Sequence, residues 1–121
     1  MEIKKIELDF SVCKVEDFSE VNFNDDFVFV GKTEEEKSVV CNTLCIPKNT
    51  IACESGWKCF RIQGVLDFSL VGILAKISTL LADNSIALYA ISTYNTDYIL
   101  VKKEQYENSL AILSQNGYTL V

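Results

Sequence analysis

Residues 57–121 constrain the fold most, because their apolar spacing switches repeatedly between the period of a strand and the period of a helix. Stretches of period two and stretches of period 3.6 follow one another in the order β-α-β-β-α-β. The first helical stretch is the clearest, and its apolar residues recur at intervals of three and four: Leu70, Ile73, Leu74, Ile77, Leu80 and Leu81. They form a stripe wide enough to cover a sheet, so we predict an α+β fold.

The expected elements of this half are a strand at 57–63, a helix over 70–81, strands at 86–91 and 98–101, a helix ending at 116–117 and a strand at 118–121. Asp67 and Ser69 both suit the N-cap of the first helix, and the pair Asp83-Asn84 suits its C-terminus. The strand at 86–91 is apolar on both faces, while two helices cover only one face of a sheet. We therefore expect the N-terminal strands or a second copy of the chain to cover the rest.

The N-terminal part of the sequence is less regular. Alternating apolar residues predict a strand over 6–13, and short apolar runs predict strands at 27–30 and 38–41. Between them, Val15, Phe18 and Val21 are spaced for one face of a brief helix. Pro47 opposes regular structure, so residues 46–56 are expected to connect the two halves.

A shift of 60 residues places 27–41 over 87–101, and both segments read as strand, polar turn and strand. This internal similarity favours a duplicated architecture. We divide the chain into an N-terminal unit at 1–55, which lacks the second long helix, and a complete C-terminal unit at 56–121.

Charge and hydropathy exclude several classes of protein. The chain carries 17 acidic and 11 basic residues, a net charge of −6, so it would repel a nucleic-acid backbone. No apolar run approaches the roughly 18 residues of a membrane helix. The first residues alternate charged and aliphatic side chains, unlike a signal peptide. We expect a cytoplasmic protein without nucleic-acid or membrane partners.

The residue types that support catalysis or metal binding are scarce. The sequence contains no histidine, and its five cysteines form no C-x-x-C pair. We interpret the cysteines as free thiols of a reducing compartment, and the acidic run at 34–36 as a solvated turn and not a metal site. No phosphate loop or dinucleotide fingerprint occurs. We expect no enzyme, cofactor or metal; a cysteine enzyme is the weaker alternative, since no base activates a thiol.

Three features of the C-terminal half resemble the ACT domain, the regulatory module of amino-acid metabolism. These are Asp67-x-x-x-x-Gly72-Ile73-Leu74, the apolar helix with Asn84-Ser85-Ile86 after it, and the hairpin. The run from Ile91 to Val101 is similar to the aspartokinase-like branch, which small bacterial tandem-ACT proteins share with the arginine sensors of animal cells. Residues 57–64 also resemble the bacterial members. The resemblance implies a ferredoxin-like sandwich of two tandem units, the first degenerate, which forms a homodimer and binds an amino acid.

The resemblance also implies which residues bind the ligand. Val71, Gly72 and Ile73 match the ligand-facing loop, together with Asp67 at its start. Tyr94 and Asp97 match the sensor's ligand pocket, and Ser92 and Thr93 precede them on the hairpin. The opening turn of a helix offers unpaired amides to a carboxylate, and Asp97 offers a partner for a cationic group.

Each of these residues also has a purely structural interpretation. Gly72 would allow the helix and the sheet to pack closely, and Asp97 would bond its own backbone in the turn. Tyr94 would pack at the hairpin tip, while Ser92 and Thr93 would satisfy the turn.

Two functions remain open from the sequence. One is an amino-acid-binding regulatory module that acts through ligand-modulated dimer or partner contacts. The other is an ACT-like dimerisation or interaction module without a ligand. The turn at 32–36 of the first unit does not match the ligand-facing pattern. The sequence therefore leaves open whether a pocket forms within one chain or between two.

Overall fold

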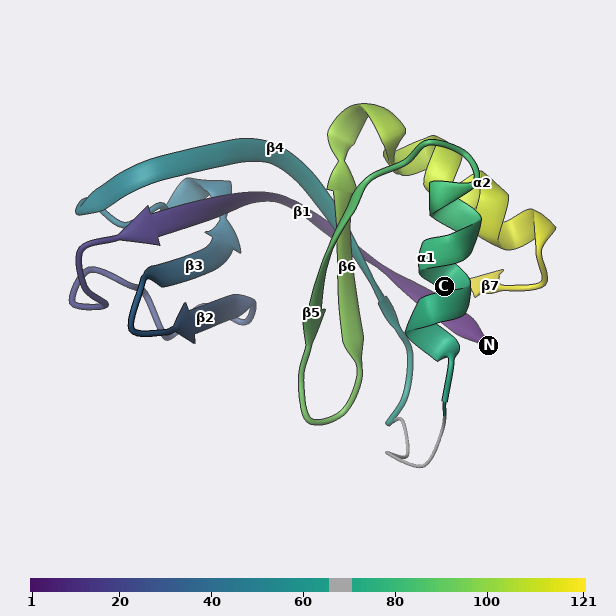
Figure 1. The fold of residues 1–121 in the computed structure, drawn as a ribbon, viewed down its shortest axis with the longest axis horizontal. Coiled ribbons are helices and arrows are strands. Elements are labelled where there is room, and N and C mark those ends of the chain that lie inside the picture. Colours follow the sequence, from purple (N-terminus) through teal and green to yellow (C-terminus); the bar gives the residue numbers. More distant parts are fainter. Residues whose placement is uncertain (66–70) are drawn as a thin grey trace. The chain divides into compact units, whose positions relative to one another are not determined.

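The computed structural model describes residues 1–65 and 71–121, which form two compact units (Figure 1). The C-terminal unit consists of Met1–Glu7 and Lys58–Val121, and the N-terminal unit consists of Leu8–Trp57. Two long strands, β1 (Glu2–Val15) and β4 (Thr50–Ile62), contribute one segment to each unit. The C-terminal unit is therefore built from both ends of the chain. The expected division of the chain at 55/56 into two duplicated units stays a prediction.

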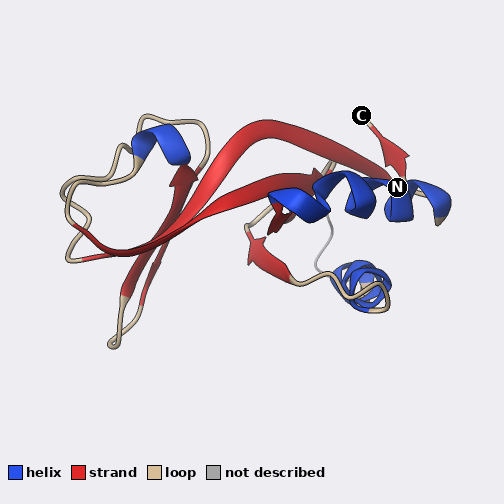
Figure 2. Ribbon diagram, turned by 90° about the horizontal axis from the view of Figure 1, so that it is seen from above, coloured by secondary structure: helices blue, strands red, loops and turns tan. Residues whose placement is uncertain are grey.

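The C-terminal unit has the predicted βαββαβ order. After β4 come α1 (Ile73–Ala82), β5 (Leu88–Ser92), β6 (Asp97–Lys102), a 3₁₀ turn (Lys103–Gln105), α2 (Tyr106–Gln115) and β7 (Thr119–Leu120). The strands lie in the order β7-β1-β4-β6-β5, and both helices lie on the same face of them (Figures 1 and 2). The α+β fold class is thus confirmed. The start of β1 is inserted between β4 and β7, with Glu2 opposite Thr119.

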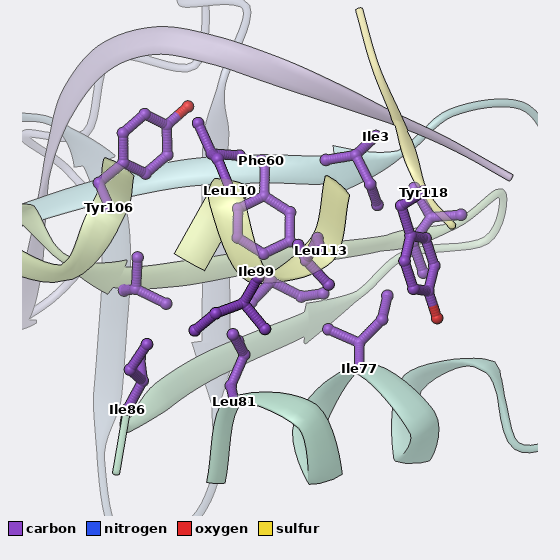
Figure 3. Packing of buried hydrophobic residues seen from close by; sticks show 13 residues of the cluster. Ile3, Phe60, Ile77, Leu81, Ile86, Ile99, Tyr106, Leu110, Leu113 and Tyr118 are labelled. Atoms are coloured by element: carbon purple, nitrogen blue, oxygen red, sulfur yellow. The ribbon is translucent and has the colours of Figure 1, made fainter. Parts of the chain in front are cut away.

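The core of the C-terminal unit lies between its helices and its sheet. Ile77 and Leu81 of α1 and Leu110 and Leu113 of α2 point toward strand residues such as Phe60, all of them almost completely buried (Figure 3). The apolar stripe read from the sequence therefore faces the sheet as predicted. Burial of this kind stabilises a fold by about 1.5–3 kcal/mol for each large apolar side chain.

Strand β5 corrects one expectation. It begins at Leu88, later than the predicted strand at 86–91, and it lies at one end of the strand order. Ile86 still belongs to the core, but it precedes the strand. The backbone turns into β5 at Ser85, whose φ is 59°, and not at Asn84. An edge position explains why β5 remains half exposed although it is apolar on both faces.

The N-terminal unit is a small sheet without an α-helix in its described residues. Besides its segments of β1 and β4, it contains β2 (Val28–Lys32) and β3 (Lys37–Asn42). The strand order is β2-β3-β1-β4. The brief helix considered for residues 14–26 is absent. Phe18 and Val21 instead pack from turns onto the buried cluster of this unit, which contains Cys13, Val15, Val39 and Cys41.

Strand β1 is longer than predicted, and its buried face changes along its length. Ile6 and Phe10 are buried as the alternation predicts, but from Ser11 onward the odd-numbered residues are buried, including Cys13 and Val15. Phe10 and Ser11 are adjacent and both buried. The shift in phase lies within the N-terminal unit, three residues after β1 enters it at Leu8.

Strand β4 contradicts the expected connecting segment. Residues 50–56 belong to this strand, and only the stretch before Thr50 connects it to β3. Most side chains from Ile51 to Ser55 are exposed, so this part of the strand lacks an apolar face. Gly56 has a φ of 87° within the strand, at the passage between the two units. The missing alternation is the reason that sequence reasoning assigned a loop.

The two hairpins share one pairing register. Val28 pairs with Cys41 in the first hairpin, and Leu88 pairs with Val101 in the second, each residue number being greater by 60. Both turns close with the same backbone hydrogen bond, from the amide of Thr33 to the carbonyl of Glu36 and from Thr93 to Thr96. The similarity noticed in the sequence thus corresponds to a shared geometry.

Candidate functional site

The candidate site begins at the N-terminus of α1. Gly72 is the N-cap, with φ 79° and ψ 4°, and it provides no capping side chain. Its carbonyl accepts the first helical hydrogen bond from the amide of Lys76 at 2.9 Å. The amides of the first turn have no acceptor within the helix, and no acidic residue lies in that turn. This helix end is electropositive and suits an anion.

The N-cap differs from the predicted one. Sequence reasoning placed it at Asp67 or Ser69, but the N-cap is Gly72, five residues after Asp67 and three after Ser69. Asp67 and Ser69 lie outside the described residues. An N-cap with φ of 79° favours glycine, because glycine adopts left-handed backbone without strain. Sequence reasoning looked for a side chain that caps the helix and therefore did not consider Gly72.

Gly72 does not serve close packing of the helix on the sheet. Among the described residues, a Cβ placed on Gly72 would meet no atom within 4 Å apart from its chain neighbours. The positive φ accounts for the glycine. No contact in the described part of the chain supports the packing interpretation of Gly72.

A pocket of about 280 Å³ opens at this helix end. It is lined by Met1, Val71, Gly72, Ile73, Lys76, Asn116, Gly117 and Tyr118. Lys76 adds a positive charge from the first turn of α1, and no carboxylate side chain is among these eight residues. Asn116 is the C-cap of α2, so the pocket lies between the start of one helix and the end of the other.

The turn of the second hairpin carries the other expected site residues. Ser92 and Asp97 are the last pair of the β5–β6 register, and the Ser92 hydroxyl donates to the Asp97 carboxylate at 2.6 Å. Thr93 closes the turn through its amide and its hydroxyl, which both donate to the carbonyl of Thr96, at 2.8 and 3.0 Å. Tyr94 lies at the tip and is 80% exposed.

A second pocket of about 300 Å³ lies beside this turn. Its lining residues are Arg61, Gln63, Gly64, Val65, Thr93, Asn95, Thr96 and Tyr98. The guanidinium of Arg61 donates to the Gln63 side-chain oxygen at 3.2 Å and to the Tyr98 hydroxyl at 3.1 Å, and it lies 5.8 Å from the centre of the Tyr98 ring. These contacts fix the cation at the wall of the pocket.

The structure distributes the expected site residues over different places. Val71, Gly72 and Ile73 line the pocket at α1, and Thr93 lines the pocket beside the hairpin. Ser92, Tyr94 and Asp97 line neither of these two pockets.

Sequence reasoning missed Lys76, Arg61 and Thr96. Thr96 is 7% exposed and its hydroxyl donates to the carbonyl of Ile62 at 2.7 Å, which ties the hairpin to β4. Lys76 follows Gly72 by four residues, a spacing that places a side chain one turn above the N-cap. That spacing was the available signal for Lys76, whereas Arg61 and Thr96 depend on contacts distant in sequence.

Comparison with known proteins supplies the family. Residues 52–115 match the family model of the ACT domain, which is more than half of the chain. The chain belongs to the ACT domain family, so the resemblance read from the sequence is confirmed. No match was found among curated proteins. Among the described residues, no helix is long and apolar enough to cross a membrane.

Solved structures agree with this assignment. Protein Atu0741 from Agobacterium tumefaciens is 27% identical, with a TM-score of 0.84 over 99% of this chain and 91% of its own. The regulatory subunit of aspartate kinase from Thermus thermophilus, in a ligand-free form, is 10% identical, with a TM-score of 0.63 over 95% and 96%. Aspartate kinase from Clostridium acetobutylicum is 15% identical, with a TM-score of 0.65 over 93% of this chain and 33% of the enzyme. The last two similarities concern the fold alone.

Proposed function

We propose that this chain is a regulatory ACT module that binds a free amino acid and passes the signal on through dimer or partner contacts. Membership of the ACT domain family and the shared fold of aspartate kinase regulatory subunits support a regulatory role. The observation that carries the proposal is the pocket between the start of α1 and the end of α2.

The two ends of this pocket suit the two charges that every free amino acid carries. The carboxylate belongs at the first-turn amides of α1 and at Lys76, where the helix end is positive. The ammonium group belongs beside Asn116 and Gly117, where α2 ends and its dipole is negative. A charge-assisted hydrogen bond of this kind contributes about 1.5–3 kcal/mol.

The residues expected from the sequence take part in this proposal in two ways. Val71, Gly72 and Ile73 form the ligand-facing part of the pocket, and Asp67, also expected there, lies outside the described residues. Ser92, Thr93, Tyr94 and Asp97 form a hairpin surface that would contact the side chain of a longer ligand. If Asp97 receives a cationic group, Asp97→Ala weakens that ligand by about one to two decades in affinity.

A thermal-shift screen against the twenty amino acids tests the proposal. A ligand at about 100 times its dissociation constant stabilises the folded protein by about 2.7 kcal/mol. Lys76→Met should reduce the shift, whereas Lys48→Met, an exposed lysine of the N-terminal unit, should leave it unchanged. The proposal fails if no amino acid raises the melting temperature at millimolar concentration.

The second candidate is an ACT-like dimerisation or interaction module that binds no small molecule. The internal bond between Ser92 and Asp97 favours it, because that bond already occupies the expected ligand residues. The outer strands β2 and β5 each have one neighbour in the strand order, which leaves an edge for another chain. Light scattering with and without the best ligand distinguishes the two functions. A molar mass that corresponds to a dimer and does not change with any amino acid supports the second.

A further inference from the structure

The described residues contain a pair of neighbouring cysteines that the proposed ligand site does not use. Cys13 on β1 and Cys53 on β4 both belong to the N-terminal unit, and their Sγ atoms are 3.6 Å apart. Cys13 is 2% exposed, whereas Cys53 is exposed to solvent. We propose that Cys13 and Cys53 form a reversible disulfide bond when the protein meets a low-molecular-weight disulfide.

The backbone already places the two residues correctly. Strands β1 and β4 are hydrogen-bonded neighbours. Ser11 meets Ser55 at 2.7 Å, and two residues along each strand Cys13 meets Cys53, so the cysteines are directly opposed. Opposed residues of neighbouring strands have Cα atoms about 4.5–5.5 Å apart, which lies within the range of natural disulfides. Side-chain rotation suffices to close the bond.

A third cysteine, Cys41, is less well placed on the strands to form a disulfide bond with Cys13. Cys41 lies on β3, where it pairs with Ser11, while Cys13 pairs with Val39. Cys13 and Cys41 are thus diagonal neighbours, whose Cα atoms are typically about 7–8 Å apart. That distance exceeds what a disulfide spans without movement of the backbone.

The exposures of the two thiols set the order of the chemistry. The exposed Cys53 thiolate attacks one sulfur of the small disulfide, whose S–S bond breaks, and one small thiol leaves. The sulfur of Cys13 then attacks Sγ of the mixed disulfide, releases the second small thiol and loses its proton to water. Burial, together with the contact to Cys53, raises the pKa of Cys13 to about 12, so the second step is the slow one. Two protein thiols are oxidised, and one reagent disulfide is reduced to two thiols.

Oxidised glutathione applied to the full chain tests the proposal. The number of free thiols should fall from five to three, and peptide mapping should find a Cys13–Cys53 bond that dithiothreitol reverses. The Cys13→Ala variant should stop at the first step and accumulate a glutathione adduct on Cys53. The Cys41→Ala variant, as the matched control, should form the same bond as the natural chain.

Other outcomes overturn the proposal. A stable glutathione adduct on Cys53 of the natural chain, with Cys13 still free, would show that the second step does not occur. A bond between Cys13 and Cys41 would show that the strand geometry was misjudged. If Cys13→Ala does not fold, the Cys53→Ser variant, altered at an exposed position, answers the question: its Cys13 should remain a free thiol.

Discussion

Gly72 shows how a single backbone angle governs the start of α1. Its φ of 79° is a conformation that costs other residues about 1–2 kcal/mol. Because a Cβ there would meet no described atom within 4 Å apart from its chain neighbours, we attribute the cost to backbone conformation. We predict that Gly72→Ala lowers the free energy of unfolding by about 1 kcal/mol, and that Gly72→Asn lowers it less because asparagine tolerates left-handed backbone. Urea denaturation without ligand measures both; equal losses would contradict this reasoning.

Two buried acids make the C-terminal unit sensitive to alkali. Burial raises the pKa of Cys59 from its ordinary 9.0 to about 12, and burial raises the pKa of Tyr106 above its ordinary 10.0. The folded state therefore holds these protons more tightly than the unfolded state. Their contribution to stability is complete below pH about 9 and falls as pH rises toward about 12.

Denaturation at a series of pH values checks this prediction. The free energy of unfolding should decline above pH about 9, and Tyr106→Phe should make the decline shallower above pH about 10. The same variant loses the hydrogen bond from the Tyr106 hydroxyl to the Cys59 carbonyl, 3.2 Å long, so its stability at neutral pH should fall by about 1 kcal/mol. An alkaline decline of unchanged slope would rule out Tyr106 as a source.

At the scale of elements, the second hairpin is held to β4 by Thr96. Its buried hydroxyl donates to the Ile62 carbonyl at 2.7 Å. Thr96→Val keeps the shape of the side chain and removes the donor, so we predict a loss of about 1–3 kcal/mol in the free energy of unfolding. Thr79→Val, an exposed position of α1, is the control and should change stability far less. Equal effects in the two variants would mean that the bond to Ile62 contributes nothing.

The elements also show how far sequence reasoning reached. Helices α1 and α2 were predicted because each has a buried face that repeats with a regular period, and strand β6 was predicted from its continuous apolar run. The first half of β4 was missed because its side chains from Ile51 to Ser55 are mostly exposed and leave no period to detect. The end of β1 was assigned to the wrong face because its burial changes phase at Ser11.

The candidate site was accessible to the sequence only in part. Val71, Gly72 and Ile73 were expected from a local motif of the ACT resemblance, and they line a pocket together. Asn116 and Gly117 complete that pocket from more than forty residues away, which is a contact that no local pattern reveals. Ser92 and Asp97 were found as a pair, but their mutual hydrogen bond depends on the β5–β6 register.

On the scale of the whole molecule, each compact unit takes residues from both sides of the expected division at 55/56. The C-terminal unit contains Met1–Glu7, and the N-terminal unit contains residues up to Trp57. We predict that fragment 56–121 lacks stable structure without fragment 1–55, because it loses the start of β1, which lies between β4 and β7 in its sheet. Circular dichroism of the separate and mixed fragments tests this, with the intact chain as the reference. A fragment 56–121 that unfolds cooperatively by itself would contradict the prediction.

The pairing of Glu2 and Ile3 with Thr119 and Leu120 has a consequence for folding kinetics. The two strands are separated by more than one hundred residues, and the amide of Val121 also donates to the carbonyl of Ile3. Contacts so distant in sequence close slowly. We therefore expect the parallel pairing of β1 with β7 to form late in refolding, after the two local hairpins.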